Sequence, residues 1–113
     1  ADNIGITVTL EAEGPVINPA VYHAESGEFI KIGNEVRSFS VNAGDVVIIT
    51  TETNNKAVYL VRDGVKQEIN EYLDEDSDFI QLQHGTNTIR YTADAGEDYL
   101  NVTVSYRFRY LGV

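Results

Sequence analysis

The sequence predicts an all-β fold, either a sandwich or a barrel. Apolar and polar residues alternate along most of the chain, as they do in strands that bury one face and leave the other in water. Turn motifs separate these segments at intervals of roughly 8–12 residues, which is the spacing of short strands in all-β domains. Helical periodicity is confined to one short stretch, so helices are not expected to build the core.

The two ends of the chain predict the longest strands. Near the start, Ile4, Ile6, Val8 and Leu10 alternate with small or polar residues. The segment Leu100–Tyr110 alternates throughout, and we expect its apolar face to be buried. That face holds Leu100, Val102, Val104, Tyr106, Phe108 and Tyr110. The first and last strands are expected to lie near each other.

Shorter alternating or apolar runs between the two ends predict the remaining strands. They are Ala20–His23, Phe29–Ile32, Val36–Val41, Val46–Thr51, Lys56–Val61, Phe79–Gln83 and Thr88–Thr92. The segment Gln67–Leu73 is the exception, since its pattern predicts a short helix of at most two turns. Pro15 and Pro19 lie in an extended or bulged link, where the missing backbone N–H does little harm.

Turn residues separate these strands. Asp63 and Gly64 lie between two apolar runs and predict a two-residue hairpin, because both central residues of a type I′ turn need positive φ. Gly, Asn and Asp are also frequent in four other predicted turns. These turns are Asn42–Asp45, Glu52–Lys56, Gln83–Asn87 and Asp94–Asp98.

The composition limits the partners of this chain. Its 113 residues predict a single domain spanning 1–113. The chain has 8 basic and 18 acidic residues, a net charge of −10, which disfavours binding to nucleic acids and anionic membranes. It has no Cys, which excludes disulfides and thiolate metal sites. Because it has no Met, we expect it to be a piece of a longer protein.

The acidic run before the Phe79–Gln83 strand is a candidate metal site. Asp74, Asp76 and Asp78 have the spacing that opens an EF-hand calcium loop. Such a loop also needs a Gly at its sixth position and a bidentate Glu at its twelfth, where this chain has Phe79 and Gly85. We therefore favour a solvated acidic loop. A calcium site completed by backbone carbonyls is the alternative.

No motif predicts catalysis or a cofactor. His23 and His84 are far apart in the sequence, and neither has the neighbours of a zinc site or a catalytic base. The chain has no Gly-x-Ser-x-Gly elbow, and its glycines are dispersed in turns rather than gathered in a phosphate loop. Paired carboxylates are not informative in so acidic a chain. We predict that the protein is not an enzyme.

Three tyrosines are candidates for carbohydrate binding. Sugar-binding sandwiches stack an exposed aromatic ring on the apolar face of a sugar, and the chain has seven Tyr but no Trp. Tyr22, Tyr72 and Tyr99 lie near predicted loops and are the better candidates for such a role. The other tyrosines, Tyr59, Tyr91, Tyr106 and Tyr110, lie at alternating strand positions and are expected to be in the core or half-buried. Arg107 and Arg109, on the polar face of the last strand, are expected to pair with acids or to contact a protein.

Several motifs occur in an order and spacing that resemble one known family. They are Gly-x-x-x-Asn-Pro at Gly14–Pro19, Gly-Glu-x-Ile at Gly27–Ile30, Gly-Asp before an apolar strand at Gly44–Ile49, Thr-x-x-x-x-Lys-x-Val at Thr51–Val58, and Gly-x-Asn-x-Ile-x-Tyr at Gly85–Tyr91. From Val8 onward, nearly the whole chain resembles the C-terminal domain of siphophage distal tail proteins. This is the phage tail component family of phages and prophages of Gram-positive bacteria.

The resemblance implies both a fold and a function. The fold would be a jelly-roll-like antiparallel β-sandwich similar to galectins and carbohydrate-binding modules. The domain would be the C-terminal part of a longer, ring-forming tail protein, made in the host cytoplasm. Its role would be a noncatalytic structural one at the tail tip or baseplate, with other tail proteins as partners. The alternatives are a carbohydrate-binding module for cell-wall glycans and a calcium-dependent adhesin.

Overall fold

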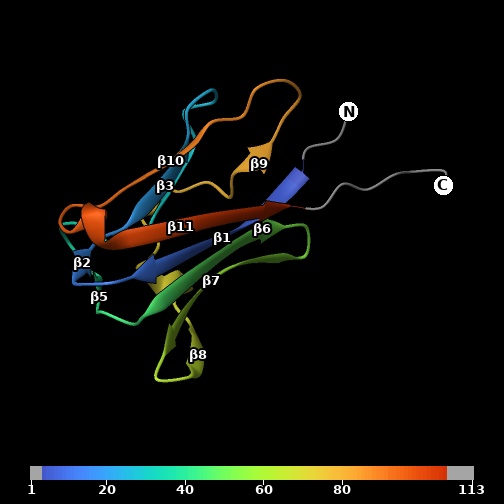
Figure 1. The fold of residues 1–113 in the computed structure, drawn as a ribbon. Helices are drawn as coiled ribbons and strands as arrows, with labels where there is room; N and C mark the ends of the chain where they lie inside the picture. Colours follow the sequence, from blue (N-terminus) through green and yellow to red (C-terminus); the bar gives the residue numbers. More distant parts are fainter. Residues whose placement is uncertain (1–3, 107–113) are drawn as a thin grey trace.

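The computed structural model describes residues 4–106 and confirms an all-β protein (Figure 1). Two single turns of 3-10 helix, η1 (Asn70–Tyr72) and η2 (Glu97–Tyr99), interrupt the strands. Within the described range, no helix has the length and apolarity needed to cross a membrane. The strands are β1 (Ile4–Ala12), β2 (Val16–Ile17), β3 (Ala20–His23), β4 (Phe29–Lys31), β5 (Ser40–Val41), β6 (Val46–Glu52), β7 (Asn55–Arg62), β8 (Val65–Glu68), β9 (Gln81–Leu82), β10 (Ile89–Thr92) and β11 (Leu100–Tyr106).

The main sheet has the order β11-β1-β6-β7-β8, and β9 pairs with the start of β1. All of its pairs are antiparallel. β1 lies between β11 and β6, so the expected proximity of the first and last strands is confirmed. Val8 is opposite Val104 on one side and Ile49 on the other. This register places the apolar residues of β1 on the inner face of the sheet.

The second layer is the sheet β10-β3-β4, which Figure 1 shows above the main sheet. A short β2–β5 pair lies beside it. Val21 and Ile30 from this layer join the same buried cluster as Val8 and Leu10 from the main sheet. The structure is therefore a sandwich of antiparallel sheets around one core. The jelly-roll winding implied by the resemblance stays a prediction.

The predicted strand at Val36–Val41 is wrong in its first half. Only Ser40–Val41 is a strand, and Val36 is 96% exposed. The side-chain oxygen of Asn34 accepts hydrogen bonds from the backbone N–H groups of Val36 and Arg37. These bonds close a turn, because an Asn side chain can replace the partners that a strand would supply.

The predicted short helix at Gln67–Leu73 is shorter than the sequence indicates, since only Asn70–Tyr72 is helical. Gln67 and Glu68 belong to β8, where Gln67 is opposite Leu60 of β7. The Asp63-Gly64 turn directs this pairing, and both residues have the positive φ that the sequence predicts, 54° and 76°. The helical character that remains is the single 3-10 turn η1, within the predicted range.

The prediction for the last strand is confirmed in position but wrong in burial. Leu100 is buried and Val102 is half-buried, whereas Val104 is 36% and Tyr106 is 50% exposed. Both exposed side chains line an open hollow instead of packing under the second sheet. The predicted residues Arg107, Phe108, Arg109 and Tyr110 lie outside the described range.

Candidate functional site

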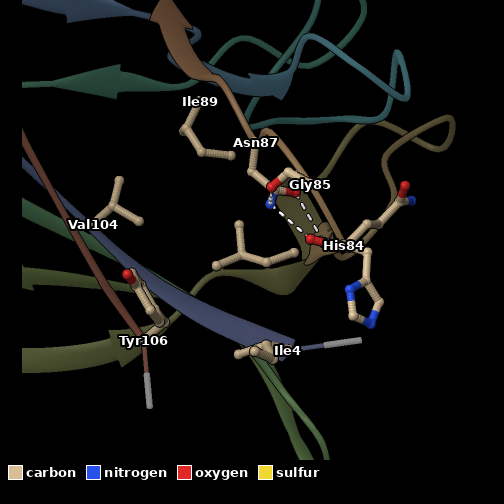
Figure 2. A pocket seen from close by; sticks show the side chains of 9 residues that line it. Ile4, His84, Gly85, Asn87, Ile89, Val104 and Tyr106 are labelled. Carbon is tan, nitrogen blue, oxygen red and sulfur yellow. Dashed lines mark hydrogen bonds between the residues drawn. The ribbon is translucent and has the colours of Figure 1, made fainter. Parts of the chain in front are cut away.

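The first hollow lies where the loop after β9 faces the end of β11 (Figure 2). It encloses about 590 Å³ and receives side chains from β1, β9, β10 and β11. Its lining residues are Ile4, Leu82, Gln83, His84, Gly85, Asn87, Ile89, Val104 and Tyr106. The aliphatic members make an apolar floor, and the polar ones gather in the Gln83–Asn87 turn. Such a hollow suits an apolar side chain of another molecule better than a charged ligand.

The turn at Gln83–Asn87 is held by the side chain of Asn87. Its Nδ2 donates to the carbonyl oxygens of Gln83 and Gly85, at 2.8 and 3.2 Å, and its Oδ1 accepts the N–H of Gln83 at 2.9 Å (Figure 2). Gly85 has a φ of 88°, which a side chain would disfavour. The ring of His84 is exposed and points away from Ile89 and Val104. This histidine is therefore a turn residue.

His23 joins this turn to the β3–β4 hairpin. It is fully buried, and its Nδ1 accepts the backbone N–H of Ser26 at 3.1 Å. The proton is thus on Nε2, which donates to Oδ1 of Asn87 at 2.8 Å. Because the Nδ1 lone pair already has a backbone donor, this imidazole does not offer a free base to a substrate. Its role is to hold two loops together.

Glu25 and Thr88 add a second link between the same loops. The carboxylate of Glu25 accepts the backbone N–H of Thr88 at 2.6 Å and its hydroxyl at 2.7 Å. These hydrogen bonds, the hydroxyl first, lower the pKa of Glu25 below its usual value. The folded arrangement of the two loops therefore favours the ionised form of Glu25.

The second hollow is a groove of about 340 Å³ on the outer face of the β10-β3-β4 sheet. Tyr22 of β3 lies directly opposite Phe29 of β4, so two aromatic rings come from neighbouring strands. The residues that line the groove are Asn18, Ala20, Tyr22, Gly27, Phe29, Lys31, Thr92 and Asp94. Aromatic faces beside hydrogen-bonding groups are the combination that a neutral polar ligand such as a sugar requires.

The polar side of this groove is an ordered network. Lys31 Nζ lies 3.2 Å from a carboxylate oxygen of Asp94, and Asn18 Nδ2 donates to the other at 2.9 Å. Asn18 first, and then Lys31, lower the pKa of Asp94. Asn18 is buried, has a φ of 50° and also accepts the backbone N–H of Phe39. The network thus fixes the charged groups beside the aromatic pair.

The three candidate tyrosines are not equivalent. Tyr22 lines the groove, whereas Tyr72 and Tyr99 do not. Tyr72 is half-buried, with its ring centroid 4.9 Å from that of Phe39 and the guanidinium of Arg37 4.5 Å above it. Tyr99 is 47% exposed, and its ring lies against Gly14. A sugar site formed by all three together therefore has no geometric support.

The acidic run is a structured loop. One carboxylate oxygen of Asp74 accepts the N–H of Asp76 at 2.9 Å, and the other accepts Nδ2 of Asn34 at 3.1 Å. These two donors, the backbone N–H first, lower the pKa of Asp74. The side chains of Asp76 and Asp78 are exposed. Over residues 4–106, no three His, Asp or Glu side chains gather as metal ligands, so the calcium site stays a prediction without support from the geometry.

Sequence reasoning missed part of the groove and the histidine network. Phe29 could have been found, because the Ser26-Gly27 turn makes Tyr22 and Phe29 neighbours on one face of a hairpin. Asp94 is far from Lys31 in sequence, and no local pattern connects them. Asn87 was assigned to the turn, but its bond to His23 depends on the packing of two distant loops.

These observations define an antiparallel β-sandwich with solvent-open hollows among its described residues. The model of the family described as siphovirus-type tail component, C-terminal domain, matches residues 2–110, and the chain belongs to this family. It is therefore a component of a phage tail, located in the virion tail, and the family indicates contacts with other tail proteins. None of the curated proteins and none of the solved structures compared with the chain matches it.

Proposed function

We propose that this chain is a noncatalytic structural module at the tail tip or baseplate, where it mediates contacts between tail proteins. The family match over residues 2–110 carries the proposal. We further propose that residues 1–113 form one domain at the C-terminal end of a longer, ring-forming protein. The family's description as a C-terminal domain supports the C-terminal position. A β-sandwich supports such a role because its two sheets hold exposed surfaces in fixed positions.

Electron microscopy of labelled particles tests this role. An antibody raised against the 113-residue chain is applied to intact phage particles that encode it. We expect the label at the distal end of the tail. Label on the capsid, along the whole tail tube, or on no part of purified particles would contradict the proposal.

A second candidate function is the binding of cell-wall glycan. The observation that favours it is the groove in which Tyr22 and Phe29 lie beside Lys31 and Asp94. Aromatic rings can stack on the apolar face of a sugar ring while the polar groups bond its hydroxyls. The groove would give the tail a second contact with the host.

A pulldown with purified cell walls of the host distinguishes this function. We expect Tyr22→Ala to abolish retention, and Tyr99→Ala to leave it unchanged, because Tyr99 lies outside the groove. Thermal unfolding of both variants checks that each is folded. Equal retention of wild type and Tyr22→Ala would eliminate the groove as a glycan site.

A further inference from the structure

β11 differs from the other outer strands of the two sheets. Its seven residues carry no charge, whereas β8, at the opposite edge of the main sheet, has four residues that include Lys66 and Glu68. The outer strands of the second sheet, β10 and β4, carry Arg90 and Lys31. Edge strands are kept from pairing with other chains when they are short or charged. β11 is neither.

The side chains of β11 are exposed on both faces. Thr103 and Ser105 are exposed on the outer face. On the inner face Val104 is 36% exposed, although Val8, its direct neighbour in the ladder, is only 1% exposed. Val104 also lines the first hollow (Figure 2). A strand added beside β11 would bring its inner side chains to a surface that is already apolar.

We propose that β11 pairs in antiparallel orientation with β11 of a second copy of this chain, with Thr103 on the twofold axis. In a twofold interface each contact occurs twice, with the roles of the two copies exchanged. In this register Val102 faces Val104 of the other copy, and Asn101 faces Ser105 of the other copy. Apolar side chains meet apolar ones, and the backbone groups of residues 101–105 that face away from β1 gain partners.

The sequence of β11 itself favours this occupant. In the antiparallel register with Thr103 on the axis, every pair over Leu100–Tyr106 joins two uncharged side chains. Two copies can therefore meet along β11 without placing a charge against an apolar residue. The proposal goes beyond the proposed tail function and does not depend on it.

Sedimentation equilibrium of the 113-residue chain tests the proposal from micromolar to millimolar concentration. We expect the mass to rise with concentration from that of the 12.5 kDa monomer toward twice this value. Thr103→Lys and Thr103→Glu each place two like charges face to face on the axis, so each should weaken association by at least about tenfold. An equimolar mixture of the two variants should associate again, because opposite charges then meet.

The matched control is Val65→Lys on the opposite edge strand, where Val65 is 65% exposed. It should associate like the wild type. Three results would overturn the proposal: a wild type that remains monomeric at all concentrations, a control that is weakened as much as the Thr103 variants, or a mixture that does not recover. We expect each Thr103 variant to fold, because Thr103 is exposed and lies opposite the uncharged Thr9. Circular dichroism of each variant checks that it is folded.

Discussion

The two ends of the sandwich differ in how far their side chains are buried and hydrogen-bonded. At the end near β2 and β5, Asn18 and Asp45 are each only 4% exposed, and hydrogen bonds engage both side chains. At the other end, where β11 finishes, Val104 and Tyr106 stay exposed beside a hollow. The first end uses polar groups to close the structure, and the second leaves apolar groups open. Stability should therefore depend more on the closed end, whereas the open end offers apolar side chains for contacts with other molecules.

Of the substitutions that test this difference, replacing Asn18 is expected to lower the free energy of unfolding most. Asn18→Ala leaves the backbone N–H of Phe39 without its partner and removes the bond to Asp94. It also places Ala at a φ of 50°, which Asn tolerates better. We expect a loss of about 3 kcal/mol in the free energy of unfolding, measured by urea denaturation.

The control for Asn18 is Asn101→Ala on β11, where the side chain is exposed. It should change the free energy of unfolding by less than about 0.5 kcal/mol. If the two variants lose the same amount, the closed end does not have the stabilising role that its hydrogen bonds indicate.

Val8 and Val104 provide a pair of substitutions in one ladder. They are directly opposite each other, but Val8 is 1% and Val104 is 36% exposed. Val8→Ala should lose about 2 kcal/mol, through lost burial and the cavity left behind, and Val104→Ala about 0.5 kcal/mol. Urea denaturation measures both. Equal losses would mean that the open end is as well packed as the core.

The ion pair of Asp45 and Arg62 predicts how stability at the closed end responds to acid. Arg62 donates to both oxygens of Asp45, at 2.6–3.1 Å, and these bonds are the main cause of its lowered pKa. A carboxyl whose pKa is lower in the folded than in the unfolded chain stabilises the fold above the unfolded value, near 3.8. This contribution is lost as the pH falls through the lower, folded pKa.

The melting temperature of Asp45→Asn should therefore fall less between pH 6 and about pH 2 than that of the wild type. At neutral pH, the variant should be less stable by about 1–2 kcal/mol, since it loses charge-assisted hydrogen bonds. Glu75→Gln, at an exposed site, is the control. A wild type and an Asp45→Asn variant with parallel pH profiles would refute this account.

Calcium is expected to have the smallest effect. Asp74 already accepts hydrogen bonds on both oxygens, and Asp76 and Asp78 do not join it in a ligand group. A ligand that binds only the folded state raises the melting temperature. We expect calcium and magnesium to have the same small effect on the melting temperature. A rise with calcium alone that Asp76→Asn abolishes would instead support the adhesin alternative.

Alternation in the sequence was sufficient to predict most strands but not their environment. Ala20–His23 was predicted to the residue, and Asp63 and Gly64 predicted the β7–β8 hairpin turn. Val36 was assigned wrongly because the turn there depends on the side chain of Asn34. Tyr106 was assigned to the core because periodicity identifies the inner face of a strand. Periodicity does not show where the second sheet ends.

The candidate sites depended still more on tertiary structure. The sequence predicts Tyr22 near the end of a strand and close to a loop, but not that it lies beside Phe29 of β4. The groove also needs Lys31 and Asp94, which only the folded chain brings to within 3.2 Å. Local sequence could indicate an aromatic candidate, but the polar half of the groove arises from contacts between distant segments.

The pairing of β1 with β11 also determines how the domain responds to mechanical force. Ile6 is opposite Tyr106, so the start of β1 and the end of β11 lie at the same end of one antiparallel ladder. The hydrogen bonds of such a ladder run across the strands. A pull that separates the two ends therefore loads these bonds one pair at a time and unzips the ladder at low force. A tail that transmits tension through this domain would therefore need to bind it at one end of the chain and at a surface far from that end, so that the ladder is not unzipped.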